Sequence, residues 1–290
     1  MKPSKVIMWI RTKGYQIWDG EIIHRRITWL PMFIRGIKEV PRKKGARFFF
    51  FLAAIPFFIF AVAIYAASKP ELDFLQDMVE VLQNDSQMFH SFFTNAYLIF
   101  MLVMICLLAG SDLISADLKY KSLPLYFMRP LTVWDYLSGK ASVLMFYLLL
   151  FTLVPGILLV ILKLIFQGEM INVFLLGAVI IFPVFTSLFL TSFTLLLSSL
   201  SESSRISKVL IFVFYLSSDI GYNMFKGMFG KDYFAVLSLK ENIVMTGSLF
   251  FQIKPPHDSP PWISFFILLA LLAGFTFLMK LRVISEERKQ

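Results

Sequence analysis

The sequence has few of the residues on which soluble enzymes and disulfide-linked domains depend. It contains one cysteine, Cys106, so neither a disulfide nor a cysteine-based metal site can form within one chain. Only 16% of the residues are charged, against about 25% in ordinary globular domains. The three histidines are far apart in the sequence and have no spacing typical of metal ligands. We therefore expect no metal centre and no cofactor.

Motifs for phosphate binding and nucleophilic catalysis are also absent. Gly139-Lys140-Ala141 lacks the upstream glycine and the hydroxyl residue of a Gly-rich phosphate loop, so the chain cannot bind ATP by that device. No G-x-S-x-G elbow occurs among the many serines. The sequence therefore does not predict an enzyme.

Long apolar runs dominate the chain, in which 58% of the residues are hydrophobic. A bilayer core about 30 Å thick is crossed by roughly 20 apolar residues in a helix. Lipid offers no hydrogen-bond partners to backbone N–H and C=O groups, so the spans must be helices. We predict an all-α polytopic membrane protein with a transmembrane domain over 47–281. The six predicted spans are 47–67, 91–110, 141–162, 173–200, 209–225 and 261–281.

The basic residues predict the orientation of these spans. Residues 1–47, the loops 111–140 and 201–208 and the end 280–290 contain 22 of the 28 Lys and Arg residues. Basic residues are enriched on the cytoplasmic side of membrane proteins, so we expect both termini in the cytoplasm, with 1–46 a basic segment and 282–290 a short tail. We place the protein in the cell membrane, the inner membrane of a bacterium.

Two amphipathic segments are predicted to lie on the membrane surfaces. Apolar residues in 23–37 form a helical stripe flanked by Arg and Lys, typical of a helix at the inner leaflet, with Pro31 breaking or restarting it. A flexible basic tail is the alternative. Residues 68–82 predict a short helix on the outer surface. The stretch 233–251 places Lys240 and Glu241 at its centre, which indicates an outer loop or a re-entrant hairpin, not a seventh span.

The loop between the second and third predicted spans is longer than a connector needs to be. Within 110–140, apolar residues alternate with charged ones, and Arg129-Pro130-Leu131 indicates a turn before a second helical piece. Such a structured elbow is suited to docking on another protein.

This loop resembles the corresponding loop of ABC-2-type transporter permeases. The matching residues are Asp117 and Lys119, Ser122-Leu123, Arg129-Pro130-Leu131 and the segment 136–140, Tyr-Leu-Ser-Gly-Lys. Asp117 stands where Glu is usual, and Lys121-Ser122 stands where Gly-Thr is usual. The layout of basic N-terminal segment, six spans and short basic C-terminus is similar to the family as well.

The resemblance implies a coupling helix that sits in a groove of a separate ATPase subunit. It also implies a transporter built from two permeases, as a homodimer or a paired heterodimer, and two ATPases, without nucleic acid. We expect an apolar face of the loop in the groove and charged residues at its rim. The predicted coupling residues are Leu113, Asp117, Leu118, Lys119, Lys121 and Leu123.

Polar residues inside two spans are further candidates. Ser187, Thr191, Thr194 and Ser198 share one face of the fourth span, which indicates either helix–helix packing or a lining for substrate. Asp219, in the fifth span, is either a buried group near the midplane or exposed in an outer vestibule. Because the fifth span of the family tends to lie at the dimer interface, Asp219 is also a candidate for a bond across it.

The sequence thus predicts the membrane-spanning permease subunit of an ATP-driven ABC transporter, an exporter energised by a separate subunit at 111–129. An accessory or scaffold membrane protein without transport of its own is the main alternative. A secondary transporter is less favoured, because paired broken helices with charges at the midplane are not evident.

Overall fold

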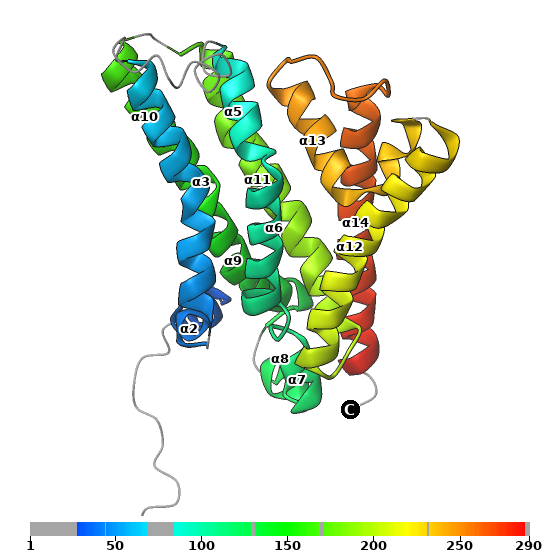
Figure 1. The fold of residues 1–290 in the computed structure, drawn as a ribbon. Helices are drawn as coiled ribbons and strands as arrows, with labels where there is room; N and C mark the ends of the chain where they lie inside the picture. Colours follow the sequence, from blue (N-terminus) through cyan, green and yellow to red (C-terminus); the bar gives the residue numbers. More distant parts are fainter. Residues whose placement is uncertain are drawn as a thin grey trace, which may run out of the picture.

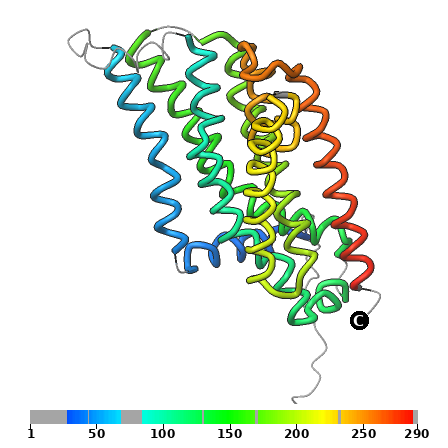
Figure 2. Tube along the Cα trace, turned by 45° about the vertical axis from the view of Figure 1, so that its right-hand side comes forward, coloured from blue at the N-terminus to red at the C-terminus, as the bar shows by residue number. Residues whose placement is uncertain are grey.

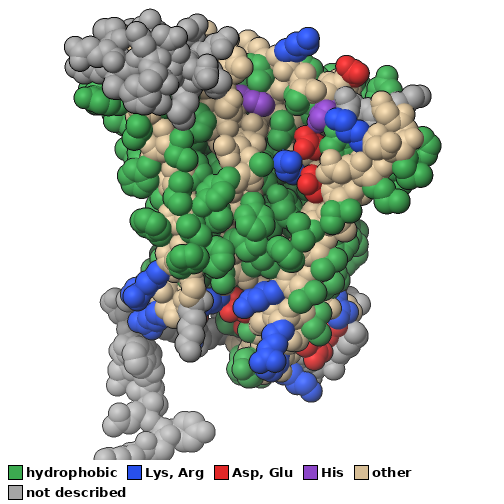
Figure 3. Space-filling model, in the orientation of Figure 1, with side chains coloured by type: hydrophobic (Ala, Val, Ile, Leu, Met, Phe, Trp, Pro, Cys, Tyr) green, Lys and Arg blue, Asp and Glu red, His purple; other side chains and the backbone are tan. Residues whose placement is uncertain are grey.

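The computed structural model describes residues 28–43, 45–68, 84–128, 131–168, 171–230 and 232–287. Every regular element in these ranges is a helix, and most of the helices run side by side as a bundle (Figure 1). The all-α class is therefore confirmed for the described part of the chain. Hydrophobic side chains cover the middle of the face drawn in Figure 3, whereas Lys and Arg gather at its lower end.

Five helical stretches are long and apolar enough to cross a membrane. They correspond to the first, second, third, fourth and sixth predicted spans, and the second and third are longer than predicted, at 35 residues each. The protein is therefore a membrane protein with several apolar helices. The five stretches are Ala46–Ala67, Asp85–Lys119, Val133–Gln167, Val173–Ser199 and Pro261–Glu286. The first and fourth are the helices α3 and α11, and the last is most of α14, Pro261–Glu287.

The second stretch consists of four helical pieces, the last of which is α7, Ser115–Lys119. The helix α5, Asp85–Phe93, ends before Asn95, whose side chain accepts hydrogen bonds from the first backbone N–H groups of α6, Ala96–Ile105. A single π-helical turn, η3, Cys106–Gly110, follows α6. Such turns inside helices are frequent at functional sites.

The third stretch is divided at Thr152 into α9, Val133–Phe151, and α10, Leu153–Gln167. Pro155 explains the break, because it has no backbone N–H to donate to the carbonyl of Phe151 and its ring crowds the preceding turn.

The fifth predicted span corresponds to α12, Ser204–Phe229, which is 26 residues long but is not among the five most apolar stretches. The prediction of six spans is therefore met only in part. Towards its C-terminal end α12 leans away from the bundle (Figure 1). The turn η4, Asp232–Leu237, and the helix α13, Leu239–Phe250, then lead back to α14. With 12 residues, α13 spans about 18 Å, too short to cross the bilayer core.

The amphipathic helix α2, Leu30–Glu39, lies across one end of the bundle (Figure 2). Pro31 is in its first turn, so this proline starts the helix and does not break it. Gly36 allows close contact with α9, because a Cβ there would lie 2.4 Å from Val143 Cγ2. Tyr147 of α9 also donates a hydrogen bond of 2.6 Å to the Ile37 carbonyl. The N-terminal part of the predicted stripe, and all of the predicted outer helix after Ser68, lie outside the described residues.

Two short helices, α7, Ser115–Lys119, and α8, Leu123–Phe127, lie at the same end of the bundle as α2 (Figure 1). A small apolar core holds them to the ends of α9, α11 and α14. A larger apolar core runs through the rest of the bundle. The segment that precedes α9 is therefore a folded unit and not a loose loop.

Candidate functional site

Asp117 is the centre of the contacts that hold α7 to α9. Its Oδ2 accepts a hydrogen bond of 2.7 Å from the Tyr136 hydroxyl and lies 2.7 Å from Lys140 Nζ. Its Oδ1 accepts one of 3.1 Å from Ser122 Oγ. Asp117 is buried, so a carboxylate with three donors is fixed at the junction of the two helices. These four residues come from the segments 117–122 and 136–140, which the sequence comparison singled out.

The predicted apolar contact face lies inside the protein. Leu118 and Leu123 are buried, 4% and 0% exposed, against Leu137, Leu195 and Met279, and Leu113 is partly buried beside them. The expectation that these leucines enter the groove of a partner is therefore wrong. They form the small core under α7 and α8. These two helices are too short to be stable without that core. Asp117 is likewise buried and is not a rim residue.

A different set of side chains faces outward from α7 and α8. Tyr120, Leu125 and Met128 are 74%, 66% and 81% exposed. Lys119 and Lys121 are exposed beside them, and the Lys119 ammonium lies 5.4 Å from the Tyr120 ring centroid. We call this set the docking face: Lys119, Tyr120, Lys121, Leu125 and Met128. Its exposed tyrosine and methionine are of the residue types enriched in protein contact surfaces, and the two lysines lie beside them.

The turn at Lys121 determines which side chains reach the docking face. Lys121 has a φ of 51°, in the left-handed region. Its N–H donates to the Leu118 carbonyl and the Ser122 N–H donates to the Asp117 carbonyl. This pair of bonds is the Schellman motif that ends a helix, in which the residue with positive φ is usually glycine. The chain therefore reverses at Lys121, and the apolar faces of α7 and α8 do not form one continuous stripe.

The four predicted hydroxyl residues of α11, Ser187, Thr191, Thr194 and Ser198, are all buried, and two of them pack the helices together. Ser198 Oγ accepts hydrogen bonds from the Ile114 and Ser115 N–H groups at 3.2 and 3.1 Å. It also donates to the Ser111 carbonyl at 2.9 Å, so it holds the start of the α7 segment to α11. Thr194 donates to the carbonyl of Leu190 in its own helix.

The other two residues of the predicted set, Ser187 and Thr191, have no hydrogen-bond partner among the described residues. Close packing at this face is further indicated by Gly110, where a Cβ would lie 2.4 Å from Thr194 Cγ2. The packing interpretation therefore holds for Thr194 and Ser198. Nothing comparable explains Ser187 and Thr191, whose role stays a prediction.

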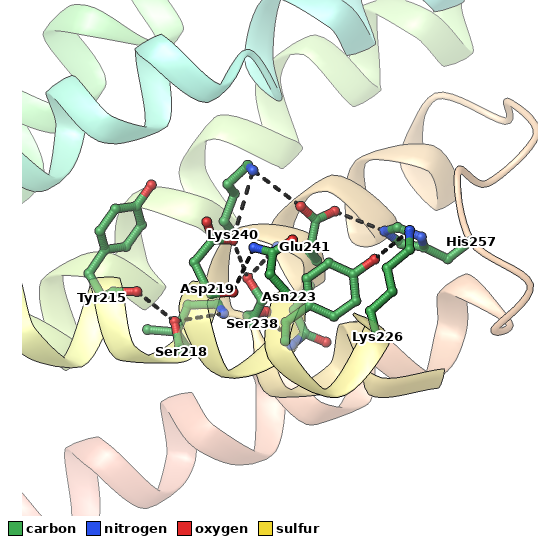
Figure 4. A network of polar contacts seen from close by, with 12 residues as sticks. Tyr215, Ser218, Asp219, Asn223, Lys226, Ser238, Lys240, Glu241 and His257 are labelled. Atoms are coloured by element: carbon green, nitrogen blue, oxygen red, sulfur yellow. Dashed lines mark hydrogen bonds and ion pairs between the residues drawn. The ribbon is translucent and has the colours of Figure 1, made fainter. Parts of the chain in front are cut away.

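Asp219 belongs to a polar network that links α12 to α13 (Figure 4). Its Oδ1 accepts a hydrogen bond of 3.2 Å from Ser238 Oγ and lies 3.8 Å from Lys240 Nζ. The same ammonium lies 3.2 Å from Glu241 Oε1. On the far side of Glu241, Oε2 lies 2.9 Å from His257 Nε2. Lys240 therefore lies between two carboxylates, and Asp219 is partly exposed and has partners within its own chain.

The network explains how the charged residues Lys240 and Glu241 are accommodated within the apolar stretch 233–251. Lys240 and Glu241 are in the first turn of α13, where Ser238 caps the helix by accepting a hydrogen bond from the Glu241 N–H. Asn242, in the same turn, donates to the carbonyls of Val236 and Ser238. The charges expected in an outer loop or hairpin are thus neutralised by α12 and by the segment that follows α13. His257 was not predicted from the sequence to be part of a site.

The comparisons with known proteins agree with these observations. The family model described as ABC-2 family transporter protein matches residues 44–279, from the segment before α3 to near the end of α14. The chain belongs to the ABC-2 family of transporter proteins. None of the curated proteins matches the chain significantly.

In this ABC-2 family permease, the outward position of Tyr120, Leu125 and Met128 was not predicted, because its signal in the sequence is indirect. A single helical period over 113–123 favours the buried leucines, whereas the exposed residues belong to two separate single-turn helices. The sequence signal for the turn was Lys121, which stands at the position where glycine is usual in the family. A glycine there indicates a chain reversal, and after a reversal the outward positions are no longer those of one helix.

Proposed function

We propose that the chain is the transmembrane subunit of an ABC transporter and that a separate ATPase docks on α7 and α8. The observation that supports this proposal is the docking face, with three large apolar side chains exposed on short helices at one end of the bundle. Buried apolar anchors supply most of the energy of a protein contact, while cations at the rim mainly determine register and choice of partner. In this proposal ATP hydrolysis belongs to the partner.

The rigidity of the segment beneath the docking face supports a mechanical role. The Asp117 contacts join α7 to α9, and Ser198 joins the start of the same segment to α11. A displacement of α7 by a partner would therefore be transmitted to two helices long enough to cross the membrane. Export as the direction of transport rests on the family resemblance.

The docking proposal is tested by Leu125→Asp and Met128→Asp in the intact transporter. Each change should reduce co-purification of a co-expressed ABC ATPase subunit by about tenfold or more, since a buried anchor contributes on the order of 2 kcal/mol. Leu200→Asp is the matched control, because Leu200 is an exposed leucine, 52% accessible, that does not belong to the docking face. Lys121→Gln should have a milder effect that depends on salt.

Unchanged co-purification and unchanged ATPase activity in both aspartate variants would contradict the docking proposal. The accessory-protein interpretation would then be the better one. The same loss in Leu200→Asp would show that charge at this end of the bundle, and not the docking face, is responsible.

We also propose six spans, with α12 as the fifth, both termini in the cytoplasm of a bacterial cell and a second permease as partner. The exposed apolar residues of α12, among them Val213, Ile220 and Met224, support its contact with lipid or a second copy. Single cysteines at Arg205 and Lys254, in a Cys106→Ser background, test the topology on intact cells. An impermeant thiol reagent should label position 254 and not position 205, and the reverse pattern would contradict the orientation.

A further inference from the structure

A cavity of about 370 Å³ lies between α2, α9 and residues 112–117, which we call the α7 segment. This volume is within the range of small-ligand sites, which is about 300–1,000 Å³. It lies apart from the docking face, none of whose five residues lines it. The charged residues of its wall are three cations and three acids: Arg35, Lys43 and Lys140 with Glu39, Asp112 and Asp117.

The six charges form three ion pairs that differ in how deeply they are buried. Lys140–Asp117, at 2.7 Å, is the most buried, with side chains 15% and 12% exposed. Lys43–Asp112, at 2.6 Å, is intermediate, and Arg35–Glu39, at 2.7 Å, is 82% and 53% exposed. An exposed pair one helical turn apart is worth little, so Arg35 and Glu39 can change partners at small cost.

The charges favour one class of ligand over its alternatives. The wall has no net charge, so an anion or a cation bound alone would give the occupied cavity a net charge beside the partly buried pair Lys43–Asp112. A ligand with one phosphate and one ammonium adds no net charge, and each of its charges meets a wall charge of opposite sign. Arg35 is suited to the phosphate, since its planar guanidinium forms two parallel hydrogen bonds with such groups.

The position and the apolar part of the wall favour a lipid over a soluble compound. The cavity adjoins α2, which lies across the end of a bundle of membrane-crossing helices (Figure 2). Met32, Leu113 and Val143 form part of the same wall, where they can contact the glycerol and first acyl carbons of a lipid. Leu30 and Ile34 of α2 are exposed apolar side chains suited to the same layer of a bilayer.

We propose that this cavity binds the headgroup of a zwitterionic aminophospholipid, with its phosphate at Arg35 and its ammonium at the carboxylates of Glu39 and Asp112. Because the wall includes Asp112 and Ala116 as well as residues of α2, the bound lipid would connect the membrane-surface helix to the α7 segment. The proposal requires that this end of the bundle lies at a membrane surface. It does not require the docking of an ATPase.

The experiment measures saturable binding of short-chain lipids to the full-length protein in detergent by native mass spectrometry. Dihexanoyl phosphatidylethanolamine should bind. Dihexanoyl phosphatidylglycerol should bind at least about tenfold more weakly, because it has no ammonium to contact the carboxylates. Arg35→Gln should weaken phosphatidylethanolamine binding by about tenfold, the equivalent of one charge-assisted hydrogen bond. Ala116→Leu, which fills the cavity without altering its charge, should also weaken it.

Lys38→Gln is the matched control. Lys38 is an exposed cation on the same helix that lines a neighbouring groove and not this cavity, so binding should be unchanged. An equal loss in Lys38→Gln and Arg35→Gln would show non-specific attraction to a basic helix and overturn the proposal. The proposal would also be overturned if phosphatidylglycerol bound as tightly as phosphatidylethanolamine or more tightly, or if phosphatidylethanolamine showed no saturable binding.

Free phosphoethanolamine separates a lipid from a soluble ligand. It should bind far more weakly than the lipid, because it lacks the apolar carbons that contact the wall. Equal binding would assign the cavity to a soluble compound and overturn the lipid proposal. None of these measurements includes the ATPase, so their failure is distinct from failure of the docking proposal.

Discussion

Two polar clusters of the permease differ in how firmly their carboxylates are bound. Asp117 is buried and has three donors within 3.1 Å, from two segments that are close in sequence. Asp219 is partly exposed, lies 3.8 Å from its nearest cation and shares that cation with Glu241 (Figure 4). The first arrangement fixes two helices in one geometry. The second leaves Lys240 shared between two carboxylates.

The largest effect is expected for Asp117→Ala. The change leaves Lys140, whose side chain is only 15% exposed, without its carboxylate and leaves the Tyr136 hydroxyl unpaired, so the free energy of unfolding should fall by about 3 kcal/mol. Denaturant unfolding in detergent, followed by tryptophan fluorescence, measures the loss. The double variant Asp117→Leu with Lys140→Met should recover most of it, because the uncompensated charge is removed. A loss below about 1 kcal/mol would contradict the view of Asp117 as a fixed point.

A smaller effect is expected for Asp219→Leu. The variant loses one hydrogen bond to Ser238 and a distant ion pair, while Lys240 keeps Glu241, so the cost should be about 1 kcal/mol. The same unfolding experiment, with Ser217→Ala on the exposed face of α12 as control, measures it. A cost equal to that of Asp117→Ala would remove the distinction between the two clusters. Altered transport or dimerisation with nearly unchanged stability would instead show a pathway or interface role for Asp219.

The smallest effect is expected for Lys121→Gly, and it should be favourable. A lysine with positive φ is strained relative to glycine, so relief of that strain should offset the greater entropy of the unfolded chain, for a net gain of less than about 1 kcal/mol. Lys121→Val is the contrasting variant, because a β-branched side chain at positive φ should cost stability. Thermal unfolding of the two variants checks the sign. A destabilised glycine variant would show that the turn depends on a contact of the lysine side chain.

The sequence predicted the membrane helices well because the underlying signal is local. A run of about 20 apolar residues is recognisable without knowledge of its neighbours, and α3, α11 and α14 begin within one residue of their predicted starts. The restart at Pro31 was likewise a local property of the chain. The more polar α12 was harder to assign, since its length fits a span and its composition does not.

The tertiary structure alone decided which side chains of the loop face outward and which partners the charged residues have. Burial of Leu118 and Leu123 depends on Leu195 and Met279, which are more than 70 residues away in the chain, and no spacing within 110–140 contains that information. The pairing of Asp219 with Lys240, and of Glu241 with His257, depends in the same way on how α12, α13 and the following segment pack. Apolar content is a property of each residue run by itself, whereas exposure and charge pairing are properties of two segments together, so the first could be predicted from the sequence and the second required the fold.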